Sequence, residues 1–348
     1  MFHNEIGFLI TLTAALVSIL LVLLVYLIIR KGLEQVKRSR IEEYKALYNE
    51  PVFEFLLTGS FNSSLTIDKN SKREAFESLL SHYSEILEGQ DEKENMQRFA
   101  EVYLSDYYRE KLNSLKWSQR MNALYYIEDF HIKVLEEEIV RFLERKKISK
   151  DELVHSLRIL AAFQHREFYK LVSEKYNTLT YLEYRTIFAR LDDTLFSKFL
   201  EGFDELPAPM QYALLDMIGY KKDTRYLAFT EDAFQNNRGE VRIKALKSLA
   251  AIGYVPSVDR YLSLLKSPEW QERMLAAKLV GSLREKTALD ELTQLLHDPV
   301  WWVRSQAGQS VMMFPEGRDV LQKVADNTKD LFARDMAVEW INRGGQRE

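Results

Sequence analysis

The segments WQERMLAAKLV (270–280) and WWVRSQAGQSV (301–311) decide the fold, because the second repeats the pattern of the first after 31 residues. GEVRIKALKSL (239–249) shows the same pattern 31 residues earlier. Two weaker copies are FARDMAVEWI (332–341) and WSQRMNALYYI (117–127). Similarity at a fixed period of about 20 to 50 residues is the sign of a repeat protein, in which neighbouring units bury one continuous core.

Every copy carries an arginine, with an alanine three residues later and a branched residue seven residues later, as in Arg304, Ala307 and Val311. This spacing places all three on one face of a helix. Six residues before the arginine stands a side chain that caps helices or closes turns, which is Asp298 in this copy. The arginines are Arg120, Arg242, Arg273, Arg304 and Arg334.

We interpret each copy as the second helix of a helix pair. Its alanine lets neighbouring helices approach closely, and its arginine reaches the capping oxygen of its own or a neighbouring unit. The arginines would then form a structural ladder along the stack, with Asp298 as a capping member. Trp301 recurs as Trp117 and Trp270, so we expect it to pack between units.

One helix pair cannot bury its apolar face alone, so we predict an all-α fold: a right-handed α-solenoid of helix pairs, preceded by a single transmembrane helix. The low contents of glycine (13 residues) and proline (7 residues) also favour helices joined by short turns. The predicted second helices lie at 117–129, 151–163, 181–191, 207–219, 239–252, 270–284, 300–313 and 331–342. Two amphipathic helices, at 71–89 and 94–112, precede them.

Phe8 to Ile29 form an apolar run of 22 residues without a charged side chain. As a helix the run measures about 33 Å, enough to cross a hydrocarbon core of roughly 30 Å. Residues 30–40 carry five basic side chains and one acidic one, whereas residues 1–29 carry no lysine or arginine. The positive-inside rule therefore predicts a single-pass protein of the cell membrane, with its N-terminus outside and its repeats in the cytoplasm. A cleaved signal peptide is the alternative, but its basic residues would precede a shorter apolar run.

The chain is accordingly expected to divide into six segments. They are a short extracytoplasmic N-terminus (1–7), the transmembrane helix (8–29), a basic juxtamembrane helical segment (30–57), a polar loop or hinge (58–72), N-terminal helices that begin or cap the array (73–116) and the repeat solenoid (117–348).

The frame from Asp298 to Ala307, with proline, tryptophan, valine and arginine at fixed places, resembles bacterial HEAT and HEAT-like repeats. The resemblance is strong over 230–342, recognisable at 104–130 and weak in between. The layout of one anchor and a cytoplasmic array is similar to membrane-tethered HEAT proteins of Gram-positive bacteria, some of which accompany membrane glycosyltransferases. This resemblance implies a non-enzymatic scaffold or adaptor that binds a protein partner, such as an accessory subunit of a membrane envelope or polysaccharide assembly.

The sequence offers little to catalysis. It has no cysteine, no phosphate-binding glycine loop and only scattered histidines, so we expect no cofactor and no metal. A formal net charge of −4 and a membrane tether argue against nucleic acid as a partner, and no small-molecule substrate is expected. An enzyme or lyase built on a HEAT-like array is the alternative function.

Trp302 is the candidate partner-binding residue. The equivalent positions of other copies hold Ser118 and Gln271, and two polar residues there indicate that this position faces solvent. An exposed tryptophan is typical of a binding hot spot. A second mode of binding would use the anchor helix itself, which offers small residues at Ala14, Ala15 and Ser18.

Overall fold

The computed structural model describes residues 2–60 and 65–344, except for the side chains of residues 2–6, 9 and 10. Met1 of the expected extracytoplasmic N-terminus, residues 61–64 of the expected loop and residues 345–348 of the expected solenoid therefore lie outside the described residues. The described ranges are 79% helical and contain no strand, so the predicted all-α class is confirmed. The chain folds as two compact units, residues 1–163 and 164–348.

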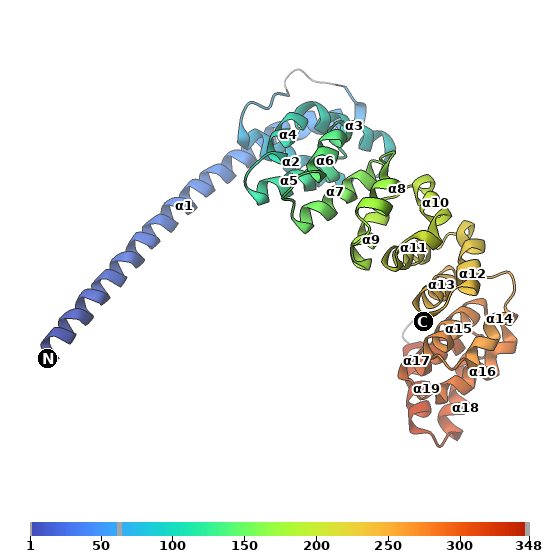
Figure 1. The fold of residues 1–348 in the computed structure, drawn as a ribbon. Helices are drawn as coiled ribbons and strands as arrows, with labels where there is room; N and C mark the ends of the chain where they lie inside the picture. The colour runs from blue at the N-terminus through green and yellow to red at the C-terminus, as the bar shows by residue number, and fades with distance from the viewer. Residues whose placement is uncertain (1, 61–64, 345–348) are drawn as a thin grey trace. The chain divides into compact units, whose positions relative to one another are not determined.

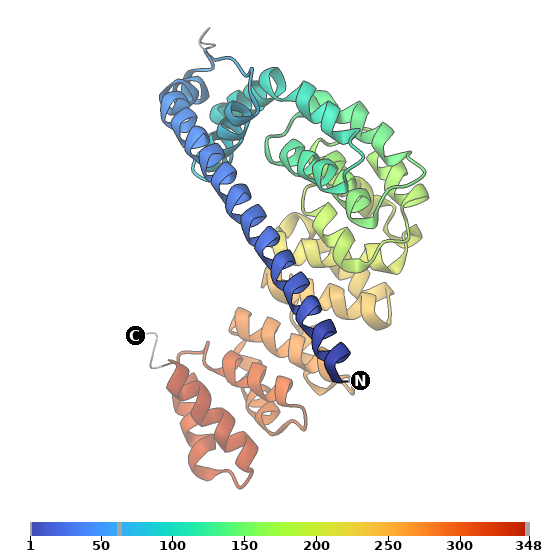
Figure 2. The ribbon, with the colours of Figure 1, turned by 90° about the vertical axis from the view of Figure 1, so that its left-hand side faces the viewer.

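The first unit opens with α1 (Phe2–Thr58), a single helix of 57 residues that Figures 1 and 2 show without interruption. Among the described residues, Thr11–Thr58 is the one stretch of helix long and apolar enough to cross a membrane, with a mean hydropathy of 3.0 in its most apolar part. Its large apolar side chains from Leu12 to Val36 are all exposed. By length and composition alone, α1 is thus a candidate membrane span.

The last turns of α1 belong to the core of the first unit. Val52, Phe55 and Leu56 are fully buried, and α1 packs there against α2 (Asn70–Ser84) and α3 (Gln90–Tyr103). The ring centroid of Phe99 lies 5.3 Å from that of Phe55 and 5.4 Å from that of Phe76. The helix that carries the candidate span is therefore also the first helix of the folded unit.

The helix predicted at 94–112 is two helices, so that prediction was wrong. α3 ends at Tyr103, and α4 (Ser105–Leu112) begins after a single residue. That residue, Leu104, has φ −121° and ψ −16°, and its side chain is fully buried. The break places Leu104 in the core and lets α4 begin the first helix pair. The burial of this side chain accompanies the interruption of the helix. The predicted helix at 71–89 is observed as α2, which ends earlier, at Ser84.

In the described residues, two helix pairs complete the first unit and six form the second. In the first unit, α4 pairs with α5 (Trp117–Asp129) and α6 (Glu136–Leu143) pairs with α7 (Lys150–Ala162). The pairs of the second unit are α8 (Phe168–Lys170) with α9 (Tyr181–Phe188), α10 (Asp193–Glu201) with α11 (Ala208–Lys221), α12 (Leu227–Asn236) with α13 (Gly239–Ile252), α14 (Asp259–Ser263) with α15 (Trp270–Leu283), α16 (Leu289–Gln294) with α17 (Trp301–Val311), and α18 (Gly317–Asn327) with α19 (Leu331–Gly344).

The eight predicted second helices are confirmed, each boundary within three residues of its predicted place. Within each unit, consecutive second helices pack side by side, as the run from α9 to α19 does in Figure 1. The alanine column lies at these contacts: Ala245, Ala276 and Ala307 are fully buried. Small side chains at this position allow the close helix approach that the repeat requires.

Candidate partner-binding site

The arginines of the repeat all occupy the fourth residue of their second helix, called the ladder position here. Counting from the first residue of each helix, this position is filled in chain order by Arg120, Leu153, Tyr184, Gln211, Arg242, Arg273, Arg304 and Arg334. A side chain so near the helix start points back over the preceding turn, because helical side chains lean toward the N-terminus. The ladder position can therefore hold the turn of its own pair.

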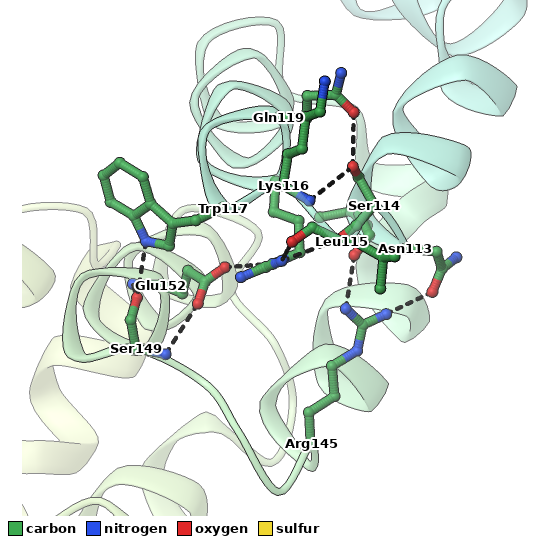
Figure 3. A network of polar contacts seen from close by, with 11 residues as sticks. Asn113, Ser114, Leu115, Lys116, Trp117, Gln119, Arg145, Ser149 and Glu152 are labelled. Carbon is green, nitrogen blue, oxygen red and sulfur yellow. Dashed lines mark hydrogen bonds and ion pairs between the residues drawn. The ribbon is translucent and has the colours of Figure 1, made fainter.

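Arg120 shows the complete arrangement in the first unit. Its Nη1 donates to the backbone oxygens of Ser114 at 2.9 Å and Leu115 at 3.1 Å, and its Nε donates to Glu152 Oε1 at 2.6 Å. Glu152 belongs to α7, so the arginine joins its own turn to the next pair. Ser149, the N-cap of α7, donates its backbone N–H to Glu152 at 2.9 Å and accepts the Trp117 indole N–H at 3.1 Å, as Figure 3 shows.

The electrostatics of this contact favour the ionised carboxylate. Burial acts to raise the pKa of Glu152, but the hydrogen bonds from Arg120 and Ser149 outweigh it and hold that pKa below its usual value. The Arg120 guanidinium is also largely shielded from water. A short charge-assisted hydrogen bond with both partners buried fixes geometry more firmly than a surface ion pair does.

Arg242 and Arg273 repeat the arrangement in the second unit. Arg242 donates from Nη1 to the backbone oxygen of Phe234 at 2.8 Å and from Nε to Glu272 Oε1 at 2.6 Å. Arg273 donates from Nη1 to the backbone oxygen of Ser267 at 2.8 Å, and its Nε and Nη2 hold both oxygens of Asp298 at 2.6 and 3.0 Å. The acceptors Glu152 and Glu272 were not found from the sequence, although the SKDE (149–152) capping box was a signal for the first.

Two pairs without the arginine keep its bond to the turn. Gln211 Nε2 donates to the backbone oxygen eight residues earlier, Phe203, at 2.9 Å, just as Arg242 does to Phe234. Tyr184 is fully buried, donates its hydroxyl to the backbone oxygen of Tyr176 at 2.8 Å and accepts from the N–H of Leu179 at 3.0 Å. In these units, the side chain at the ladder position donates a hydrogen bond to a backbone oxygen of the preceding turn, and glutamine or tyrosine can do this as well as arginine.

The ladder changes at its C-terminal end. Arg304 still donates from Nη1 to the backbone oxygens of Asp298 at 2.8 Å and Pro299 at 3.1 Å. Its Nε is buried and has no acceptor among the described residues, and its guanidinium carbon lies 5.1 Å from the ring centroid of Phe332. Within residues 2–60 and 65–344, Arg334 has one distant ion pair, 3.9 Å from Asp335, with both side chains substantially exposed.

An exposed apolar surface lies beside this end. It is formed by the first two residues of α17 and of α19, which we call the aromatic edge: Trp301, Trp302, Leu331 and Phe332. Trp302 is 59% exposed and Phe332 69% exposed. Trp301 and Trp302 meet edge to face, with ring centroids 4.7 Å apart. Because α17 and α19 pack together, the aromatic edge spans two consecutive helix pairs.

The expectation that Trp301 packs between units stays a prediction. The side chain is 47% exposed, and Trp117 in the equivalent place is 49% exposed. Both are the first residue of a helix, where the surface beneath a side chain is the short turn and not a preceding helical turn. The ring of Trp270, at the same place in α15, is less exposed than either.

A polar cluster that the sequence did not single out joins the second helices α9, α11 and α13. The buried carboxylate of Asp216 accepts the hydroxyl of Tyr181 and lies 3.2 Å from Lys247 Nζ and 3.5 Å from Lys244 Nζ. Lys244 also lies over the Tyr181 ring, 4.4 Å from its centroid. All four side chains satisfy one another, so we assign this cluster to the packing of the second helices.

The histidines do not converge in the described part of the chain, where no group of three or more histidine or acidic side chains could hold a metal ion. His297 instead pairs with Asp330 at 3.0 Å, and His155 lies 3.0 Å from Glu128. The chain contains six histidines: His3, His82, His131, His155, His165 and His297. The side chain of His3 lies outside the described residues.

Residues 258–342 match the sequence family of HEAT repeats. The segment covers the last three helix pairs with Arg273, Arg304 and the aromatic edge, and it confirms the HEAT resemblance there. A crystal structure of an engineered protein is similar over 88% of this chain and 99% of that chain, with 12% identity and a TM-score of 0.37. The curated proteins contain no match to the chain. HEAT repeats commonly serve as protein-interaction scaffolds, which suggests this role for the matched helix pairs.

Proposed function

We propose that this protein is a membrane-anchored scaffold that binds a protein partner through the aromatic edge. α1 crosses the membrane with its N-terminus outside, and the helix pairs lie in the cytoplasm. The mechanism is binding and not chemistry: the anchor raises the local concentration of the partner at the membrane, and the ladder holds the binding surface in shape. The partner is a membrane or membrane-associated protein, as expected of an accessory subunit in an envelope or polysaccharide assembly.

The exposure of the aromatic edge supports this proposal most directly. Trp302 and Phe332 stand on consecutive helix pairs, and both are more than half exposed. Large exposed apolar side chains on adjoining helices are typical of interaction sites, because aromatic residues that a partner buries supply much of the binding energy of an interface. Trp302, the residue selected from the sequence, thus stands in a larger surface that the sequence did not reveal.

Site-specific crosslinking in cells tests the proposal. A photoreactive amino acid at position 302 of the full-length protein should give a discrete crosslinked species. The matched control places the same group at Tyr220, an exposed aromatic residue of the same unit away from the aromatic edge. Identical crosslinking patterns at the two positions would overturn the assignment of the surface.

A second arm concerns the anchor. The crosslinked species should be lost when residues 1–40 are removed if the partner lies in the membrane. A cytoplasmic partner captured equally well by residues 41–348 would contradict the membrane part of the proposal and leave the scaffold part standing.

A further inference from the structure

Three arginines of the ladder make the same bond with their Nε atom. Arg120, Arg242 and Arg273 each donate it at 2.6 Å to a carboxylate of the following helix pair. For Arg120 and Arg242 the acceptor is a glutamate at the third residue of the next second helix, and for Arg273 it is the turn residue Asp298. In these three pairs, the Nε of the arginine at the ladder position is therefore placed to donate to a carboxylate of the next helix pair.

Arg304 makes the same kind of bonds to its own turn but, within the described residues, meets no such carboxylate. In the next pair, Ala333 stands where the others have glutamate, and Thr328 stands where Arg273 finds Asp298. The carboxylate of Asp330 is engaged elsewhere, since one oxygen pairs with His297 at 3.0 Å and the other accepts the Phe332 N–H at 2.9 Å.

The unmet bond is buried and lies next to the aromatic edge. The side chain of Arg304 is only 9% exposed, and among the described residues its Nε has no acceptor. A buried charged donor without an acceptor is costly, so an incoming carboxylate gains more here than at the surface. The ring of Phe332 lies over this guanidinium and is itself mostly exposed. A change in the rotamer of Phe332 would therefore make Arg304 accessible to a carboxylate from solvent.

We propose that Arg304 binds an aspartate or glutamate side chain of the partner, which takes the place that Glu272 takes beside Arg242. The guanidinium offers two parallel N–H groups to a carboxylate, while the aromatic edge receives the apolar residues around it. The partner segment is thus an acidic residue within an apolar stretch. This inference rests on the proposed function, because it names the chemistry that the aromatic edge recognises.

A pair of labelled peptides tests the inference on the full-length protein in detergent. One blocked peptide of five residues carries a single aspartate between leucines, and its twin carries asparagine. By fluorescence anisotropy the aspartate peptide should bind about tenfold more tightly, the ratio expected when one charge-assisted hydrogen bond is gained. Equal affinity for the two peptides, or binding of neither, overturns the inference.

Substitutions locate the effect. Ala333→Glu supplies the carboxylate that Arg304 lacks, so the preference for aspartate should vanish and the melting temperature should not fall. Thr328→Asp does the same from the position equivalent to Asp298 and serves if the first variant folds poorly. Arg318→Gln, at an exposed arginine of α18, removes the same charge away from the site and should keep the preference. A preference that survives both Ala333→Glu and Thr328→Asp contradicts the role of Arg304.

The outcomes separate this inference from the proposed function. Trp302→Ala should weaken both peptides while their ratio is kept. If it does so and Ala333→Glu changes nothing, the aromatic edge stands and the carboxylate inference fails. If Ala333→Glu abolishes the preference and Trp302→Ala has no effect, the carboxylate site stands and the aromatic edge fails.

Discussion

At the scale of single residues, Arg273 donates four hydrogen bonds, to the backbone oxygens of Ser267 and Pro268 and to both carboxylate oxygens of Asp298. Both members of the ion pair are largely buried. Arg273→Ala leaves the buried carboxylate of Asp298 without its ion-pair partner and with only the hydrogen bond from the Val300 N–H, so we expect the free energy of unfolding to fall by about 3 kcal/mol. Urea denaturation followed by circular dichroism measures this change.

Arg334→Ala is the matched control, because it deletes the same side chain from the same position of another helix. Its guanidinium lies 3.9 Å from Asp335, and both side chains are substantially exposed. An exposed pair of this kind contributes up to about 1 kcal/mol. Equal losses in the two variants would show that the bonds to Asp298 contribute nothing to stability.

Asp193 gives the second unit a predictable response to acid. Hydrogen bonds from Lys221, at 3.0 Å, and from Arg225, at 2.6 Å, lower the pKa of Asp193 to about 2. In the unfolded chain an aspartate titrates near pH 3.9. Because the folded pKa is the lower one, the stabilisation is complete above about pH 4 and is lost as the pH falls toward 2.

Asp193→Asn should therefore lower the melting temperature at neutral pH and flatten its decline between pH 4 and pH 2. A series of thermal melts across that range measures both effects. Asp204→Asn removes an exposed carboxylate of the same unit and should leave the decline as it is in the natural chain. A variant at Asp193 whose melting temperature falls as steeply as that of the natural chain would rule out this linkage.

At the ladder position, the arginines could be predicted from the sequence, but the residues that replace them could not. The arginines and their spacing predict the second helices, because identical side chains recur at identical places. Tyr184 and Gln211 hold the turn in the same way, yet no common residue type connects them to the arginines. Their equivalence becomes visible only through geometry: each donates to a backbone oxygen eight residues earlier. Of the four residues of the aromatic edge, the sequence indicated only Trp302 as a binding candidate, because Leu331 and Phe332 stand in a copy without the tryptophan.

At the scale of helices, the contact between α15 and α17 depends on Gly281. A Cβ atom there would lie 2.4 Å from Cβ and 3.0 Å from Cα of Ser310, so the two helices would have to move apart. Ser310 is itself fixed, since its hydroxyl donates to the backbone oxygen of Ala277 at 2.8 Å. We expect Gly281→Ala to destabilise the second unit by about 1–2 kcal/mol, because overpacking outweighs the better helix propensity of alanine.

Gly219→Ala provides the comparison from the equivalent position of α11. The nearest atoms to an added Cβ are the hydroxyl and Cα of Ser248, at 3.2 and 3.3 Å, which a small shift accommodates. Urea midpoints should therefore fall clearly for the first variant and little for the second. A larger fall for Gly219→Ala would show that the spacing between α15 and α17 is not what limits the contact.

Helix breaks are harder to predict than helix periods. The sequence from 94 to 112 keeps its amphipathic spacing through Leu104, so nothing in the local pattern announces the end of α3 there. The break depends on the core that receives Leu104, which is a tertiary property. Similarly, the point along α1 at which its side chains enter the core depends on contacts such as that of Phe55 with Phe99 of α3. No change in local composition marks this point.

At the scale of the whole molecule, one helix carries both the candidate membrane span and part of the core. Two truncations separate these roles. Removal of residues 1–40 deletes the apolar span and leaves the buried end of α1, so residues 41–348 should fold and appear in the soluble fraction. Removal of residues 1–58 also deletes Val52, Phe55 and Leu56, which are fully buried.

Each of these three side chains contributes about 1.5–3 kcal/mol through burial. Their combined loss is comparable with the whole stability of a domain, about 5–15 kcal/mol, so residues 59–348 should have an unfolded or readily proteolysed first unit. Limited proteolysis measures this, with cleavage expected first between residues 65 and 163. If residues 59–348 resist protease as well as residues 41–348 do, the end of α1 is dispensable to the core. If they do not, the end of α1 is required for the first unit to fold, and the helix that carries the candidate span also supplies part of the core of that unit.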